Sequence, residues 1–196
     1  MDAKLQKTFE KRRRISKEDA LEVMKENFQE LFIAYNDGLE HYNQIIMELR
    51  PEVRVRVDSG ILNACIAQSF MEQFPDRWTQ GKYGRIIFRW EKISLMIKKL
   101  NKNCKPSYIP TILSEAITNQ RQVPLFDCEE AKEDAVLFFG YTKNSHGELL
   151  NPRLVFYDDE VKWIANLDDI TTKPVEEPAT KPVVRLKQEK INKKAE

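Results

Sequence analysis

Residues 85–100 read Arg-Ile-Ile-Phe-Arg-Trp-Glu-Lys-Ile-Ser-Leu-Met-Ile-Lys-Lys-Leu, and this stretch decides the fold class. Side chains point to alternate faces of a strand, so residues 85–90 would place Arg85, Ile87 and Arg89 on one face. Ile86, Phe88 and Trp90 would then lie on the opposite face. Glu91 and Lys92 then predict a turn, and residues 93–100 predict the return strand of a hairpin.

The flanking sequence extends this hairpin in both directions. Further strands are expected at residues 135–141, 153–157 and 161–167, which gives an antiparallel sheet of about five strands. Upstream, apolar residues recur every three or four positions, which predicts a long helix over about 17–49. A second helix is expected over about 60–74. Helices that precede a sheet in this way indicate the α+β class.

The domain organisation follows from composition. Residues 1–15 are expected to form a basic flexible arm, because four consecutive cations there interrupt any apolar stripe. Residues 16–170 are expected to form a single α+β domain. Residues 171–196 contain three prolines, many charges and no aromatic residue, so a disordered charged tail is expected.

Several chemistries lack the residues that they need. The chain has three cysteines without a C-x-x-C pair and two isolated histidines, which argues against a disulfide framework or a zinc site. It also lacks a phosphate-binding glycine motif and a G-x-S-x-G nucleophile motif. No apolar run approaches the ~18 residues of a membrane helix. We therefore expect a soluble, cytoplasmic, non-enzymatic protein without a cofactor and without membrane contact.

The net charge of +1 conceals blocks of opposite sign. Residues 50–105 sum to +7 and residues 106–170 to −7. A basic block interleaved with aromatic residues is typical of nucleic-acid binding, and a basic β-ribbon follows phosphates well. The cations predicted to bind nucleic acid are Arg85, Arg89, Lys98, Lys99 and Lys102, with Arg12, Arg13 and Arg14 as a second anchor. The alternative is that these cations pair with the acidic block or protect a sheet edge.

Two other functions stay open. A magnesium-dependent restriction-like nuclease needs an acidic residue near a Glu-x-Lys motif, because carboxylates hold the metal and the lysine positions the attacking water. The residues that fit this pattern are Glu148, Asp158, Glu160 and Lys162. The third possibility is a structural or assembly protein that uses the long helix. The favoured function is a binding protein for nucleic acid or for a protein partner in a nucleic-acid-handling complex.

Two stretches of the chain also suggest a resemblance. The first combines Tyr-Gly-Arg-Ile-Ile-Phe-Arg at 83–89 with Met-Ile-Lys-Lys-Leu-Asn at 96–101. The second combines Gly-Tyr at 140–141, Asn-Pro-Arg-Leu-Val-Phe at 151–156 and Lys-Trp-Ile at 162–164. In this order they resemble small uncharacterised proteins of bacteria and their phages, over roughly residues 54–168. Ile97 stands where that group has phenylalanine. The resemblance implies a bacterial or mobile-element setting and no activity.

Overall fold

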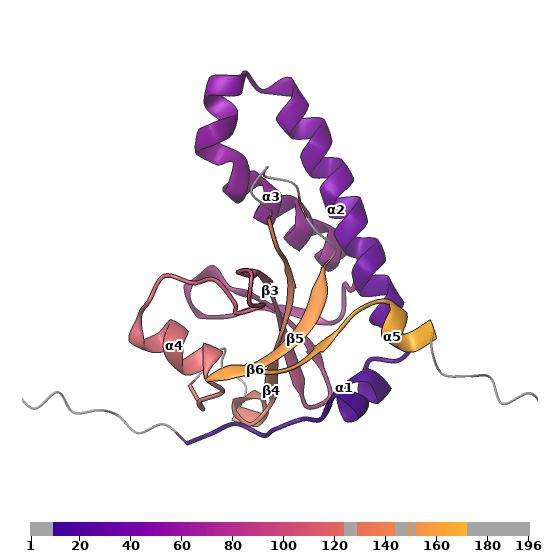
Figure 1. Ribbon diagram of the computed structural model, residues 1–196, viewed down its shortest axis with the longest axis vertical. Coiled ribbons are helices and arrows are strands. Elements are labelled where there is room, and N and C mark those ends of the chain that lie inside the picture. Colours follow the sequence, from indigo (N-terminus) through magenta and orange to yellow (C-terminus); the bar gives the residue numbers. More distant parts are fainter. Residues whose placement is uncertain (1–9, 124–128, 144–148, 150–151, 172–196) are drawn as a thin grey trace, which may run out of the picture.

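A six-stranded mixed sheet forms the centre of the computed structural model, which describes residues 10–123, 129–143, 149 and 152–171 (Figure 1). The strands are β1 (Trp78–Gln80), β2 (Ile86–Trp90), β3 (Ile93–Lys99), β4 (Ala135–Tyr141), β5 (Arg153–Asp158) and β6 (Glu160–Ala165). They follow one another in the sheet in chain order. This arrangement confirms the α+β class and the predicted hairpin, with Trp90 opposite Ile93 across the turn.

One strand pair departs from the expected antiparallel sheet. β3 and β4 run parallel, from Ile93 opposite Ala135 to Lys99 opposite Tyr141. A parallel pair needs a long crossover, and residues 100–134 supply it. The short helix α4 (Ile112–Thr118) lies within this crossover, where the sequence favours a helix. β1, which reads as part of a loop, is a sixth strand paired with β2.

The predicted long helix is interrupted near its start. It forms α1 (Lys17–Val23) and α2 (Phe28–Glu48), separated by a turn. The side chain of Asn27 in this turn accepts a hydrogen bond from the indole of Trp90 at 3.0 Å. The turn is thus fixed by a strand some sixty residues away in sequence, which a helical period cannot reveal.

The second helix, α3 (Pro51–Gln73), begins nine residues earlier than expected. Pro51 occupies its first turn, where the fixed φ of proline favours a helix and its missing N–H costs nothing. The alternating residues 52–57 therefore lie on a helix. The Arg54 guanidinium donates to the Leu49 carbonyl at 2.7 Å and to the Met47 carbonyl at 3.1 Å, which fixes the bend between the helices.

Helices α2 and α3 form a hairpin that packs on one face of the sheet and extends beyond its end (Figure 1). The helices approach closely at Gly38, where an added Cβ would lie 2.7 Å from the Cα of Ile66. Phe32, Phe70 and Phe139 join the helices to the sheet through ring contacts of 5.3 to 5.4 Å. This aromatic cluster forms the larger of two cores.

The smaller core lies on the opposite face, beneath the crossover and α4. It contains Met96, Phe138 and Ile117. The fully buried side chain of Gln120 bonds to the backbone N–H and carbonyl of Val136 and to the carbonyl of Tyr157. Gln120 thereby holds the crossover against β4 and β5. The remaining elements are the short helical turns η1 (Lys82–Gly84), η2 (Glu129–Lys132) and α5 (Asp168–Thr171).

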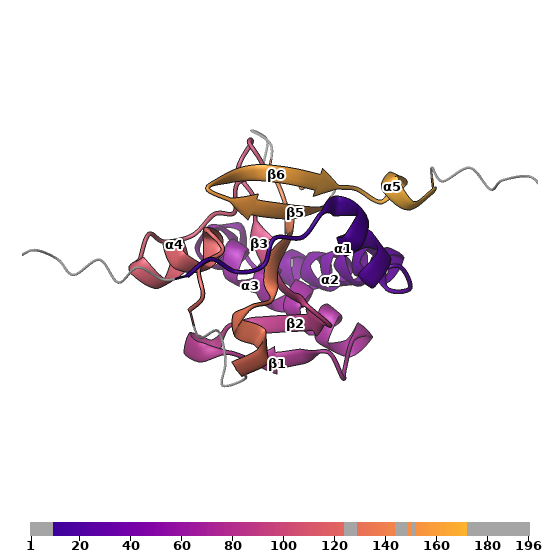
Figure 2. The same ribbon diagram turned by 90° about the horizontal axis from the view of Figure 1, so that it is seen from below.

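Residues 10–15 belong to the domain, which corrects their assignment to a flexible arm. Lys11 pairs with Arg121 in an isolated bridge, and Arg12 is only 3% exposed. Figure 2 shows this segment running along the underside of the molecule toward α1. The sequence shows four consecutive cations without an apolar stripe, which suggests no packing. In the structure, however, backbone carbonyls of the crossover accept hydrogen bonds from the Arg12 guanidinium. The remainder of the predicted arm lies outside the described residues, and so does the tail predicted over 171–196 apart from Thr171, the last residue of α5.

Candidate functional site

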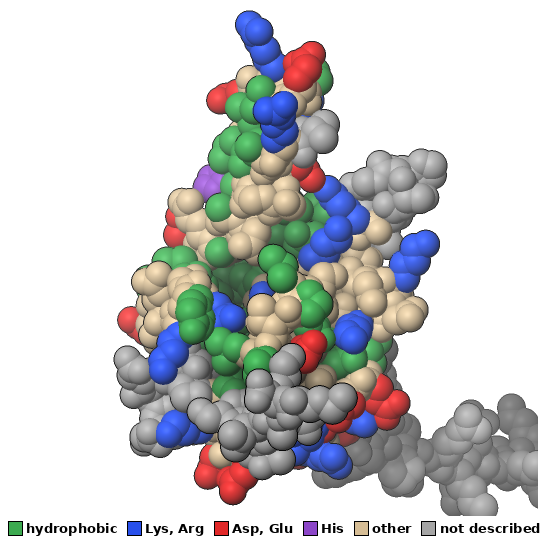
Figure 3. Space-filling model, turned by 90° about the vertical axis from the view of Figure 1, so that its left-hand side faces the viewer, with side chains coloured by type: hydrophobic (Ala, Val, Ile, Leu, Met, Phe, Trp, Pro, Cys, Tyr) green, Lys and Arg blue, Asp and Glu red, His purple; other side chains and the backbone are tan. Residues whose placement is uncertain are grey.

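A groove opens at the end of β3, between α3 and the crossover. It consists of two adjoining hollows with volumes of about 700 and 220 Å³. The hollows share the lining residues Asn63, Arg85, Met96, Ile97 and Lys98. Lys99, Tyr108 and Ile109 line the larger hollow, and Tyr83 lines the smaller one. Figure 3 shows the hollow surface on this face, with basic and apolar side chains around it. We call this region the basic groove.

Strand pairing brings the cations of the basic groove together. Phe88 lies opposite Leu95, so counting outward along both strands places Arg85 beside Lys98. Both side chains lie on the sheet face that carries the smaller core, because side chains alternate along a strand. Lys99 follows at the exposed end of β3. Three of the cations predicted to bind nucleic acid thus lie at one groove.

These cations form no ion pair with a carboxylate among the residues that the structure describes, although the charge of Lys99 acts on Asp58 at longer range. No described carboxylate comes within the 4.0 Å of an ion pair with Arg85, Lys98 or Lys99. Burial lowers the pKa of Lys98, and the neighbouring charge of Arg85 lowers it further. The carboxylate of Asp58, beside the groove residue Ser59, is held by Lys143 at 2.6 Å and by the Tyr42 hydroxyl. The described lining of the basic groove therefore carries net positive charge.

Two tyrosine rings, of which Tyr83 is exposed and Tyr108 is half-buried, accompany the cations. Tyr83 lies in the turn η1 and lines the smaller hollow of the groove. The guanidinium of Arg85 lies 5.3 Å from the centre of the Tyr83 ring. On the crossover side, the Lys105 ammonium lies 6.0 Å from the ring centre of Tyr108. The groove thus offers aromatic surface beside positive charge at both of its ends.

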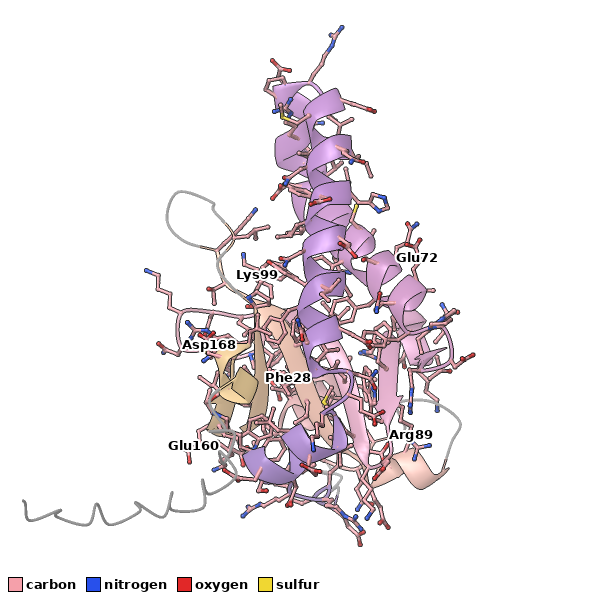
Figure 4. All side chains as sticks on the ribbon, turned by 90° about the vertical axis from the view of Figure 1, so that its right-hand side faces the viewer. Phe28, Glu72, Arg89, Lys99, Glu160 and Asp168 are labelled. Carbon is pink, nitrogen blue, oxygen red and sulfur yellow. The ribbon has the colours of Figure 1, made fainter. Side chains whose placement is uncertain are left out.

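Arg89 lies at the opposite end of the same hairpin, as the labels of Arg89 and Lys99 in Figure 4 show. Its Nε donates to Oδ2 of Asp134 at 2.7 Å, and the Asp134 side chain is only 4% exposed. The hydroxyl of Ser94 donates to the same carboxylate oxygen at 3.2 Å. Arg89 therefore holds a buried acid, as the pairing alternative expects, and is separated from the groove.

Arg12 is also engaged inside the protein. Its guanidinium donates to the carbonyls of Arg121, Val123, Ala131 and Asp134 at 2.7 to 3.2 Å. Burial lowers its pKa to about 10, while the charge of Asp134 opposes this shift. Its prediction as a phosphate anchor is wrong, because its donors already bind carbonyls that are shielded from water.

The remaining predicted cations lie away from the groove lining. Arg13 is exposed on the docked segment, and its backbone N–H donates to the Glu133 carbonyl at 3.1 Å. Arg14 lies 3.6 Å from the carboxylate of Asp158. Lys102 is exposed in the turn that follows β3. The structure therefore divides the predicted cations into one group at the groove and several scattered ones.

The described carboxylates of the nuclease alternative are engaged with cations and do not form a cluster of metal ligands. Asp158 is 2% exposed and its carboxylate pairs with Lys11 as well as Arg14. Glu160 projects from the outer edge of the sheet (Figure 4), where Lys162 lies 2.8 Å away and lowers its pKa. Glu148 lies outside the described residues. Within the described ranges, no group of three or more His, Cys, Asp or Glu side chains is placed to hold a metal.

The α3 side of the groove is the part that sequence patterns miss. Ser59, Gly60 and Asn63 line it. An added Cβ at Gly60 would meet nothing within 4 Å, so this helical glycine faces open space. A glycine inside a helix costs ~1 kcal/mol relative to alanine, and this is the single signal that the sequence offers for this side of the groove.

Comparisons with known proteins give no further guidance. Searches against protein-family models, curated proteins and solved structures find no match to this chain. Among the helices that the structure describes, none combines the length and the apolar character needed to cross a bilayer.

Proposed function

We propose that this protein binds nucleic acid, with the phosphate backbone lying in the basic groove. One observation supports the proposal above all others. Arg85, Lys98 and Lys99 gather at a concave surface with no described carboxylate in ion-pair range. A cleft lined by charges of one sign focuses the electric field and attracts ligands of the opposite sign, so three cations at one hollow suit a polyanion.

Electrostatics explain why a polyanion would bind tightly there. Burial and the charge of Arg85 both disfavour the protonated form of Lys98, as its lowered pKa indicates. A phosphate between the two side chains would offset this repulsion. Each phosphate contact also releases condensed counterions from the nucleic acid, which adds a favourable and salt-dependent term.

Binding rather than catalysis suits the residues of the groove. The described side chains that line its two hollows include amines, a guanidinium, hydroxyls and an amide, and none of them is a carboxylate, a histidine or a cysteine. General acid–base catalysis uses carboxylates, histidine, cysteine, lysine or tyrosine, and of these the described lining has only lysines and tyrosines. The nuclease alternative receives no comparable support, because Asp158 and Glu160 are each paired with a cation.

A matched pair of lysine variants tests this proposal. Lys99 and Lys92 are both exposed residues of the same hairpin, but Lys92 lies in the turn at the far end from the groove. We expect Lys99→Ala to weaken binding to a labelled oligonucleotide and to reduce the salt slope by ~1, whereas Lys92→Ala binds like the unchanged protein.

The measurement is fluorescence anisotropy at about 50 and 200 mM salt, across which nucleic-acid affinity falls steeply. Equal effects of the two substitutions would place the binding surface elsewhere. The absence of binding at the lower salt concentration would refute the proposed function.

A further inference from the structure

The basic groove combines positive charge with exposed apolar side chains of unusual size. Tyr83 is 83% exposed at one end of the groove. Ile109 lines the other end and is 84% exposed, and its neighbour Ile112 is 80% exposed. Covering such side chains with a ligand is favourable, because it removes apolar surface from water. The ligand of this groove should therefore present apolar surface as well as phosphate.

The backbone holds Tyr83 in an uncommon conformation. Its φ of 61° lies in the left-handed region, and φ of the following Gly84 is 70°. This region is unfavourable for a bulky residue. The Arg85 guanidinium lies against the ring at 5.3 Å, so the side chain that faces the phosphate site also braces the ring. The ring is thus held beside a cation while most of its surface stays open to solvent.

We propose that the basic groove selects single-stranded nucleic acid, with a base stacked on Tyr83 and the neighbouring phosphates at Arg85 and Lys98. This proposal rests on the proposed function and names its substrate class. Unpaired bases expose flat apolar faces that stack on aromatic side chains, and such stacking tolerates any base sequence. Ile109 then offers apolar surface to a further base at the other end of the groove.

A duplex fits the same surface poorly. Its bases are stacked within the helix and present only their edges in the grooves, so the ring face of Tyr83 finds no partner. Lys98 is partly buried in the floor shared by the two hollows. The phosphates of a duplex lie on the outside of a stiff rod, whereas a flexible strand can enter a hollow. Charge alone would attract both ligands, and the apolar rims distinguish them.

Two ligands and two variants test this selection. The ligands are a labelled oligothymidylate of about 20 nucleotides, enough to span such a groove, and a duplex of the same length. The variants are Tyr83→Ala, which removes the ring, and Tyr83→Phe, which retains it. Melting curves of both variants serve as the control for folding, and the exposed position of Tyr83 predicts that they match the unchanged protein.

We expect the single strand to bind at least about tenfold more tightly than the duplex at equal salt. Tyr83→Ala should weaken single-strand binding by about tenfold and leave duplex binding unchanged, and Tyr83→Phe should bind normally. Duplex binding as tight as single-strand binding would overturn the selection and leave the proposed function intact. Normal single-strand binding by Tyr83→Ala would overturn the stacking role. Failure to bind either ligand would overturn both proposals.

Discussion

The two ends of the β2–β3 hairpin carry the same kind of side chain in different surroundings. Arg85 and Arg89 lie four residues apart on one face of the hairpin, ~13 Å from each other along the strand. Arg89 holds the buried carboxylate of Asp134 at 2.7 Å. Arg85 lies beside Lys98 and the ring of Tyr83, with no described carboxylate in ion-pair range. One end therefore stabilises the fold, and the other is available to a ligand.

Arg85 and Arg89 differ in their surroundings because the carboxylate of Asp134 lies beside Arg89 and not beside Arg85. Asp134 immediately precedes β4, and the parallel pairing of β3 with β4 brings it to the Arg89 end. At the other end, β4 reaches Gly140, whose absent side chain leaves room for Lys98 and Leu100. A Cβ there would lie 2.4 Å from the Lys98 carbonyl and 2.6 Å from Leu100 Cγ. Strand register therefore separates Arg89, which pairs with a buried acid, from Arg85, which has no described carboxylate in ion-pair range.

The largest effect is expected from removing the structural arginine. Arg89→Ala leaves Asp134 buried with a weaker set of partners, and breaking such a pair typically costs ~3 kcal/mol. The free energy of unfolding, measured by urea denaturation, should fall by about that amount. Arg85→Ala should change it by less than ~0.5 kcal/mol, as is usual for a side chain without a buried partner. Equal losses in the two variants would contradict the comparison.

A second substitution adds a carboxylate to the basic groove, as Asp134 supplies one at the Arg89 end of the hairpin. Gly60→Glu places a carboxylate on the α3 side of the groove, where the added side chain has open space. The acid should neutralise part of the positive charge and weaken nucleic-acid binding by more than about tenfold. The helix should become more stable by up to ~1 kcal/mol, because glycine is a poor helix former.

Gly60→Gln is the matched control for this charge, since it has the same shape and no charge. It should retain most of the affinity, as judged by anisotropy at low salt. An equal loss of binding in the Gln and Glu variants would indicate steric blockage instead of electrostatics.

The smallest effect is a pH dependence at Lys98. Its pKa is lowered by burial and by Arg85, so it loses its proton at a lower pH than an ordinary lysine of pKa 10.5. The charged amine is the form that would bind phosphate, so affinity should decline as the pH rises toward 10.5. Because the folded-state pKa is depressed, the free energy of unfolding should rise slightly over the same pH range.

Lys98→Arg provides the reference, since a guanidinium stays charged throughout this range. The variant should bind with little pH dependence up to about pH 10. A parallel decline in the variant and the unchanged protein would exclude Lys98 as the titrating group.

Much of the fold is predictable because its signals are local. The alternation in 85–90, the two-residue turn and the apolar run of β4 each lie within a few positions. The parallel β3–β4 pair and the break at Asn27 depend on contacts between distant segments. The start of α3 at Pro51 was missed for a different reason. The alternation that follows it is typical of a strand, and tertiary packing overrides this preference.

The candidate site divides in the same way. Alternation predicts that Arg85 and Arg89 share a face, but only the fold shows that Asp134 binds one of them. The burial of Arg12 is equally hidden, because its partners are backbone carbonyls, which carry no sequence signal. The α3 side of the groove, around Asn63, becomes visible only when the helix is packed on the sheet.

Mapping the contact surface by NMR tests whether the basic groove binds nucleic acid. Amide chemical shifts of the ¹⁵N-labelled protein are followed during titration with a short oligothymidylate. We expect the largest changes in amide chemical shift at residues 59–63, 82–85, 96–99 and 107–111, which surround the basic groove. The turn at Glu91 and Lys92 and the surroundings of Arg89 should remain unchanged. Shifts centred on that opposite end, or spread evenly over the surface, would contradict the assignment of the basic groove as the binding site.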